Sequence, residues 1–194
     1  MINSRIKDLK NLFNKENIDG YVVPKNDEFF SEFSKIDRLK IISNFSGSAG
    51  YAIILKKKNY LFVDGRYTIQ AQIESGKNFI ITDSHKIVNC NLFKNLTLGI
   101  NPKLFTSNQI KKFFLKNNKI KLIKKDLIKQ NSQKKLNHSR PFFSLDKNIV
   151  GESHKKKINK IINFLERNKS NFIFITAPEN VAWLLNIRGY DNPN

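Results

Sequence analysis

The chain has 194 residues, of which 40% are hydrophobic and 16 are phenylalanine, so it holds enough apolar material for a packed core. Thirty-five Lys and Arg residues against sixteen Asp and Glu residues give a net charge of +19. No run of about 18 apolar residues is present, which excludes a membrane-spanning helix from the sequence. Residues 1–8 do not resemble a secretory signal, and the single cysteine, Cys90, fits a reducing compartment, so we expect a cytoplasmic protein.

The first half of the chain alternates helical patterns with short apolar runs. A helix is expected from Ser4 to Asn17, followed by a strand at 20–23, a turn-rich segment at 27–33 and a helix at 38–42. Two apolar runs, 51–55 and 60–63, flank a polar turn, which is typical of a β-hairpin. Asp64 follows the hairpin and is expected to cap the next helix.

That next helix is predicted over 66–74, with Ile69 and Ile73 facing the core and Gly76 at its end. Further strands are expected at 79–82, 96–100 and 120–123, and a helix begins at Ser107. Strands that alternate with helices, together with one hairpin, predict an α/β fold with a mixed β-sheet flanked by helices.

The polar segment 129–148 is predicted to be a linker between a first domain, 1–128, and a second α/β unit, 149–194. In this second unit we expect a helix at 153–168, a strand at 172–175 and a helix at 179–185. About fifty residues are too few to close a core. We therefore expect the second unit to be incomplete within this chain.

A cluster of small residues, Ser46–Gly50, immediately precedes the hairpin, where it would let another backbone or a ligand approach closely. A phosphate loop and a nucleophile elbow both lead into a helix, whereas this cluster leads into a strand. Both readings are therefore rejected.

Several segments in fixed order resemble the creatinase/aminopeptidase P family, above all the long Xaa-Pro aminopeptidases. The segments are 43–50 and 64–71 at the centre, 19–24, Asp27, 31–33 and 37–39 upstream, and 140–141, 151–153 and 182–191 downstream. The resemblance covers nearly the whole chain. It departs from the family pattern at Phe29, Phe30 and Phe33, where relatives often carry His and Tyr, and near Pro141, where a Trp is missing.

The resemblance implies a creatinase-type N-terminal domain with a ribonuclease-H-like sheet, followed by the start of a second, similar domain. Relatives hydrolyse peptides with proline at the second position, using two divalent ions, usually Mn, held by two Asp, one His and two Glu in a C-terminal domain. That domain is expected to be absent from this chain, so we assign no catalytic or metal-binding residue here. The parent is expected to be a homodimer.

By the same resemblance, the N-terminal domain borders the substrate groove of the partner subunit. The expected substrate-binding residues are Ser46, Gly47, Ser48, Arg66 and Tyr67. Arg66 offers a planar fork suited to a carboxylate, although an ion pair with Asp64 or Asp37 is the alternative. Arg38 is expected to pair with Asp37.

The remaining reactive side chains do not form a recognised site. His85, His138 and His154 lie in separate polar contexts without metal-ligand spacing, and Cys90 has no neighbouring base. Two other interpretations stay open: a stand-alone creatinase-fold binding module without peptidase activity, and a basic nucleic-acid-binding protein. The lysines are not interleaved with aromatic residues, which disfavours a specific nucleic-acid site.

Overall fold

A computed structural model describes residues 2–30, 36–88, 92–114, 116–128 and 141–190. Its first part contains the helices α1 (Ile2–Lys15), α2 (Arg38–Ser43), α3 (Thr68–Ser75) and α4 (Ser107–Phe113). Its strands are β1 (Gly20–Pro24), β2 (Gly50–Leu55), β3 (Asn59–Val63), β4 (Ile80–Asp83), β5 (Thr97–Ile100) and β6 (Lys119–Leu122), and its short 3-10 helices are η1 (Gly65–Tyr67), η2 (Ser84–Ile87) and η3 (Pro102–Leu104).

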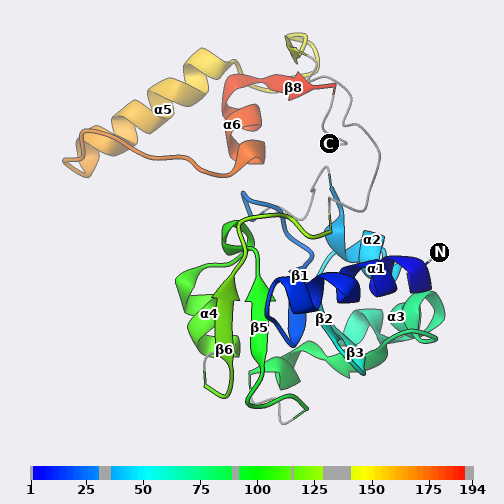
Figure 1. Ribbon diagram of the computed structural model, residues 1–194. Helices are drawn as coiled ribbons and strands as arrows, with labels where there is room; N and C mark the ends of the chain where they lie inside the picture. The colour runs from blue at the N-terminus through cyan, green and yellow to red at the C-terminus, as the bar shows by residue number, and fades with distance from the viewer. Residues whose placement is uncertain (1, 31–35, 89–91, 115, 129–140, 191–194) are drawn as a thin grey trace.

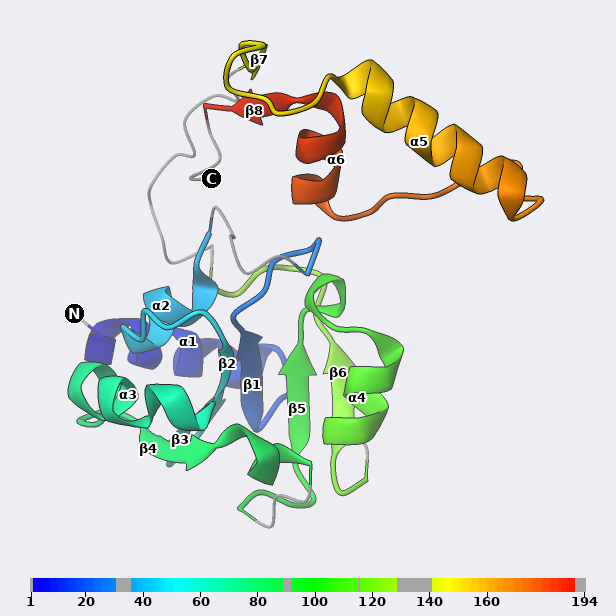
Figure 2. The same ribbon diagram turned by 180° about the vertical axis from the view of Figure 1, so that it is seen from behind.

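These strands form one six-stranded sheet in the order β4-β3-β2-β1-β5-β6. Figure 1 labels β3, β2, β1, β5 and β6 of this sheet, and Figure 2 also labels β4. Strand β2 is antiparallel to both of its neighbours, and the other neighbouring pairs are parallel. The predicted mixed sheet and hairpin are thereby confirmed. Because five strands share one direction, their carboxyl ends lie along one edge of the sheet, beside the start of β2.

Helices cover both faces of the sheet, as Figure 2 shows from behind. Helices α1, α2 and α3 pack on one face, where the predicted apolar stripe of α1 buries Ile6, Leu9 and Phe13. Helix α4 and η2 pack on the other face. Each face has its own apolar cluster, so the sheet is buried on both sides, as its long apolar runs require.

The prediction that Ile69 and Ile73 face the core is wrong: they are 78% and 79% exposed. Helix α3 instead buries Ala71 and Ser75, and the Ser75 hydroxyl donates a 2.8 Å hydrogen bond to the Ser43 carbonyl. Small side chains let α3 approach the end of α2 closely, which turns the two isoleucines outward.

The expected pairing of Arg38 with Asp37 is also wrong. Arg38 is buried, and its guanidinium donates to Glu28 and Asp126, each over 2.7 Å. Asp37 caps α2 by accepting from the Lys40 amide, and it pairs with Lys25. A buried guanidinium needs carboxylate partners more than an exposed one does, because its charge is removed from water. The prediction failed because it considered only the adjacent residue, whereas Asp126 lies far along the chain.

The second part contains β7 (Phe142–Ser144), α5 (His154–Arg167), α6 (Pro178–Leu185) and β8 (Ile187–Gly189), with β7 and β8 paired antiparallel. Strand β7 falls in the predicted linker, 129–148, of which residues 129–140 lie outside the described residues. The division into domains 1–128 and 149–194 stays a prediction.

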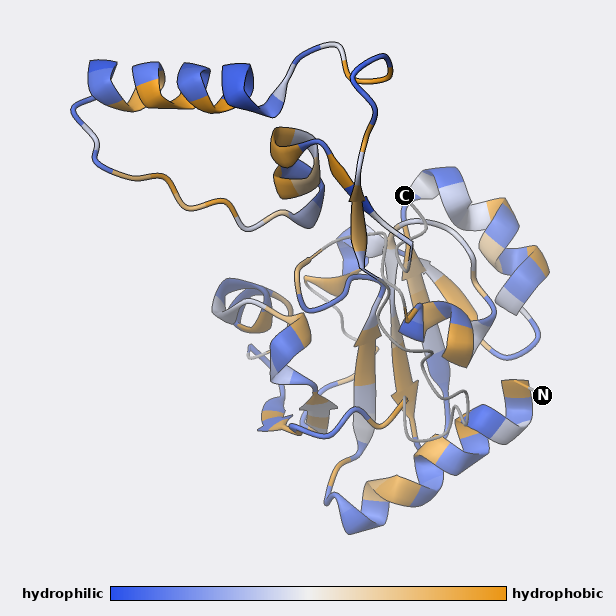
Figure 3. Ribbon diagram, turned by 90° about the horizontal axis from the view of Figure 1, so that it is seen from above, coloured by the Kyte–Doolittle hydropathy of each residue, from blue (hydrophilic) through white to orange (hydrophobic). Residues whose placement is uncertain are grey.

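The strand expected at 172–175 does not form a ladder with any described residue. Phe172 and Phe174, which belong to this segment, are 82% and 84% exposed. Figure 3 shows apolar residues along one side of α5 as well. Helix α6 ends at Leu185, and its C-cap, Asn186, has a left-handed backbone conformation.

Within the described residues, no helix combines the length and the apolar character needed to cross a membrane.

Candidate functional site

The small-residue cluster and the segment after the hairpin meet at the carboxyl edge of the sheet. Gly50, the first residue of β2, pairs with Val63, the last residue of β3. The cluster before β2 therefore lies beside Asp64 and η1. All five predicted substrate-binding residues, Ser46, Gly47, Ser48, Arg66 and Tyr67, belong to this junction.

Hydrogen bonds hold the cluster to α3. The Ser46 amide and hydroxyl donate to the Glu74 carboxylate over 2.8 and 2.7 Å. The Gln70 amide donates to the Ser46 hydroxyl over 2.8 Å and to Glu74 over 3.1 Å. The sequence analysis did not assign Glu74 to this site. The one feature that could have identified it is its position four residues after Gln70, which places both side chains on one face of the helix.

Burial works to raise the pKa of Glu74, but the hydrogen bonds from Ser46 and Gln70 outweigh it and hold this pKa below its ordinary value. The hydrogen-bonded carboxylate thus stabilises the fold above the ordinary pKa of a glutamate. That contribution is lost as the pH falls through the lowered pKa of the folded state.

A second contact fixes the cluster to η1. The hydroxyls of Ser48 and Tyr67 lie 2.8 Å apart, within hydrogen-bonding distance, and the half-buried Tyr67 ring meets Phe45 edge-on at 5.7 Å. Ser46, Ser48 and Tyr67 thus all take part in contacts within the chain.

Of the two carboxylates named as the alternative partners of Arg66, Asp64 forms the ion pair, with Nε at 2.9 Å. Its guanidinium also lies 5.5 Å from the centre of the Tyr67 ring. Asp64 caps η1 as predicted, because it accepts a hydrogen bond from the Arg66 amide. The hydrogen bond from the Arg66 side chain, followed by that of its amide, lowers the pKa of Asp64. The Arg66 side chain remains 74% exposed at the rim of the junction.

The two glycines of the cluster are required by packing. A Cβ added to Gly47 would lie 2.3 Å from the Phe45 ring, and one added to Gly50 would lie 2.9 Å from the Phe62 carbonyl oxygen. Gly65, in the neighbouring turn, has no atom within 4 Å of such a Cβ.

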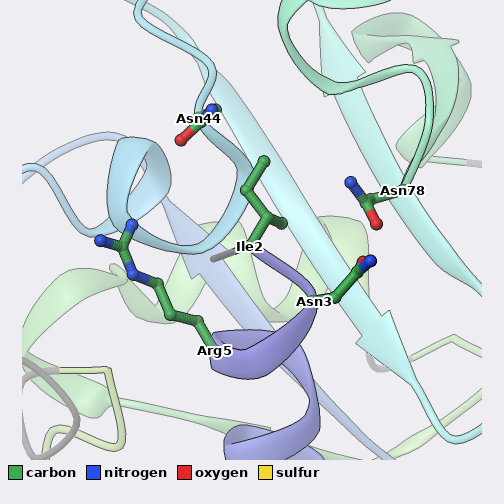
Figure 4. Close-up of a pocket in the computed structure, with 5 residues that line it drawn as sticks. All are labelled: Ile2, Asn3, Arg5, Asn44 and Asn78. Atoms are coloured by element: carbon green, nitrogen blue, oxygen red, sulfur yellow. The ribbon is translucent and has the colours of Figure 1, made fainter.

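Two hollows adjoin this region. The first, in Figure 4, has a volume of about 380 Å³ and is lined by Ile2, Asn3, Arg5, Asn44 and Asn78. Arg5 is already engaged there, since it donates to the Ile41 carbonyl over 2.9 Å. The second has a volume of about 160 Å³ and is lined by Lys25, Asn26, Phe30, Ser48, Ala49, Gly50 and Tyr51. Sequence analysis missed Lys25, Phe30 and Tyr51 as lining residues.

The described residues contain no group of three or more His, Cys, Asp and Glu side chains that could hold a metal ion. His85 lies in η2 and His154 in α5. Cys90, His138 and the motif residues 31–33 and Asp191 lie outside the described part of the chain.

Gly47→Ala is expected to lower the free energy of unfolding by about 1–3 kcal/mol, because the new methyl group overlaps the buried Phe45 ring. Gly65→Ala is the matched control and should stay within about 0.5 kcal/mol of the wild type. Urea unfolding followed by circular dichroism measures both. Equal stability of the two variants would contradict the packing role of Gly47.

Ser46→Ala is expected to raise the pKa of Glu74 towards its ordinary value, because the variant removes the hydroxyl donor. A carbon-detected NMR titration of the side-chain carboxyl group measures this pKa. Ser107→Ala, on α4, is the control and should leave it unchanged. An identical Glu74 pKa in Ser46→Ala and wild type would show that the hydroxyl does not stabilise the carboxylate.

Comparison with known proteins identifies the family to which this chain is similar. A model of the "Creatinase/Prolidase N-terminal domain" matches residues 5–125, and a second model with the same description matches residues 132–194. The chain is 32% identical to the probable Xaa-Pro aminopeptidase P of Coprinopsis cinerea over 94% of its own length and 32% of that protein. It is 28% identical to Xaa-Pro aminopeptidase 1 of Dictyostelium discoideum, covering 98% of this chain and 34% of the relative.

Among solved structures, the X-prolyl aminopeptidase from Caenorhabditis elegans has the same fold, with a TM-score of 0.79 and 24% identity. That alignment covers 100% of this chain and 36% of the neighbour. The chain spans about a third of the length of the relatives it matches. From the family-model match over residues 5–125, the chain belongs to the creatinase/prolidase N-terminal domain family.

Proposed function

We propose that this chain is the non-catalytic N-terminal part of a cytoplasmic, metal-dependent Xaa-Pro aminopeptidase. The parent enzyme would release the N-terminal residue that precedes proline in a peptide. The observation that carries this proposal is the similarity to the probable Xaa-Pro aminopeptidase P of Coprinopsis cinerea along 94% of the chain. The Caenorhabditis elegans neighbour is described as a cytosolic enzyme, which supports the compartment.

The catalytic metals belong, in this proposal, to a part of the parent outside this chain. A two-metal hydrolytic site needs several hard oxygen ligands that converge on both ions. The described residues offer no such group, so we derive no catalytic step from them. The Caenorhabditis elegans neighbour is described as having a di-nuclear active site, and we propose two Mn ions for the parent of this chain.

The contribution of this chain is to give contacts in a homodimer and one wall of the substrate groove. Arg66 lies at an exposed rim position, where its guanidinium could meet the carboxylate of a peptide. Gly47, Ser46, Ser48 and Tyr67 act indirectly, since their contacts with Phe45, with Glu74 and with each other fix the shape of the wall.

The purified 194-residue chain, supplied with Mn²⁺, is expected to release no alanine from Ala-Pro-Phe above the buffer rate. The full-length parent under the same conditions should release it, and should lose this activity to a chelator. Liquid chromatography of the products measures both reactions. Mn²⁺-dependent cleavage by the 194-residue chain alone would contradict the proposal.

A further inference from the structure

The edge of the sheet opposite the candidate site carries an excess of positive charge. Five strands begin at this amino edge, and β2 ends there. The edge is formed by the stretches that lead into these strands, residues 16–19, 56–58, 76–79, 92–96 and 116–118. The stretches hold six lysines and two acidic residues, namely Lys56, Lys57, Lys58, Lys77, Lys94 and Lys116 against Glu16 and Asp19.

Contacts between these stretches make the amino edge a continuous surface. The Asn59 side chain, at the start of β3, donates to the Asn78 carbonyl over 2.9 Å, and the Asn95 amide donates to the Asn117 carbonyl over 2.7 Å. Neighbouring strands lie roughly 4.8 Å apart, so the five intervals of the six-stranded sheet give the lysines a row about 24 Å long.

Acidic partners neutralise little of this charge. Lys56 and Asp19, 2.8 Å apart, form the one ion pair among the described residues of these stretches. The carboxyl edge differs, because its carboxylates are matched with cations in the pairs Lys25–Asp37, Arg38–Glu28, Arg38–Asp126 and Arg66–Asp64. The amino edge thus retains most of its positive charge, which suits a partner with many negative charges.

The side chains of the amino edge suit phosphates rather than bases. The two aromatic residues of the stretches, Phe79 and Phe93, are buried, so they offer no ring for the base stacking that holds single strands. The stretches contain no arginine, whose planar fork pairs with base edges, whereas lysine acts as a point charge. Such a surface fits a duplex, whose bases are stacked inside and whose phosphates lie outside.

An anionic membrane fits this surface less well. Peripheral binding to lipid combines lysines with apolar side chains that insert below the headgroups. Among the described residues of the amino edge, the exposed large apolar side chains are Ile80 and Leu92, at 47% and 49%. The edge therefore offers a long row of charge but little apolar area.

We propose that the amino edge binds the phosphate backbone of a double-helical nucleic acid through its exposed lysines, without reading the base sequence. A duplex carries one negative charge per roughly 1.7 Å of its axis, so a row about 24 Å long faces on the order of fourteen phosphates. Figures 1 and 2 show α5, α6 and β8 beyond the carboxyl edge, so a duplex at the amino edge leaves the candidate site free. The proposal does not rest on the proposed peptidase function.

The test is fluorescence anisotropy of a labelled 20-base-pair DNA duplex with the 194-residue chain at several KCl concentrations. The variant Lys57→Glu/Lys58→Glu/Lys119→Glu reverses three exposed charges, of which Lys119 is the first residue of β6. It is expected to weaken binding about tenfold or more. It should also reduce the slope of log K against log salt by about 2.7, since each phosphate contact contributes about 0.9.

A matched control makes the same change in net charge at the other edge. Lys103, Lys124 and Lys125 are exposed and follow the ends of β5 and β6. Charges more than about 10 Å from a ligand are largely screened at 0.1 M salt. The variant Lys103→Glu/Lys124→Glu/Lys125→Glu should therefore bind within about twofold of the wild type, and circular dichroism checks that both variants are folded.

Equal losses in the two triple variants would show that net charge alone drives binding, and would overturn the assignment of the amino edge. Absence of binding at low salt would overturn the proposal as a whole. Tighter binding to phosphatidylserine vesicles, to polyglutamate or to a single strand than to the duplex would assign the edge to a different polyanion. A strong preference between two duplexes of unrelated sequence would contradict recognition through phosphates alone.

Discussion

The close approach of the Gly47 and Gly50 backbones to their neighbours determines how the carboxyl edge of this sheet is built. Gly47 leaves room for the ring of Phe45, and Gly50 lies against the carbonyl of Phe62 in β3. Side chains at these positions would push the cluster away from the hairpin. The junction with η1 and the wall that Ser48, Ala49 and Gly50 give to the smaller hollow both depend on this close packing.

Polar groups in a family motif need not face a substrate. The Ser46 and Ser48 hydroxyls, which look available in the sequence, contact Glu74 and Tyr67 within the chain. Arg66 forms an ion pair with Asp64, which the sequence analysis gave as the alternative to substrate binding. Its side chain nevertheless lies at the surface. The motif therefore combines residues that shape the edge with one exposed cation, and the proposed groove wall follows from both.

Local signals in the sequence predicted the elements that depend on local physics. The apolar stripe of α1, the hairpin and the Asp64 cap are confirmed, because periodicity, turn composition and capping act over a few residues. The orientation of α3 and the partners of Arg38 depend on segments distant in the chain, so they were predicted wrongly. The hollow beside Lys25 was missed for the same reason, since its walls come from two separate segments.

The central claim is that this chain serves a metallopeptidase without carrying its metal site. The most direct measurement is the nucleotide sequence that follows the codon of Asn194. The account predicts an open reading frame that encodes a further domain with two Asp, one His and two Glu as metal ligands. A stop codon directly after Asn194 would contradict it, and would favour a stand-alone creatinase-fold binding module.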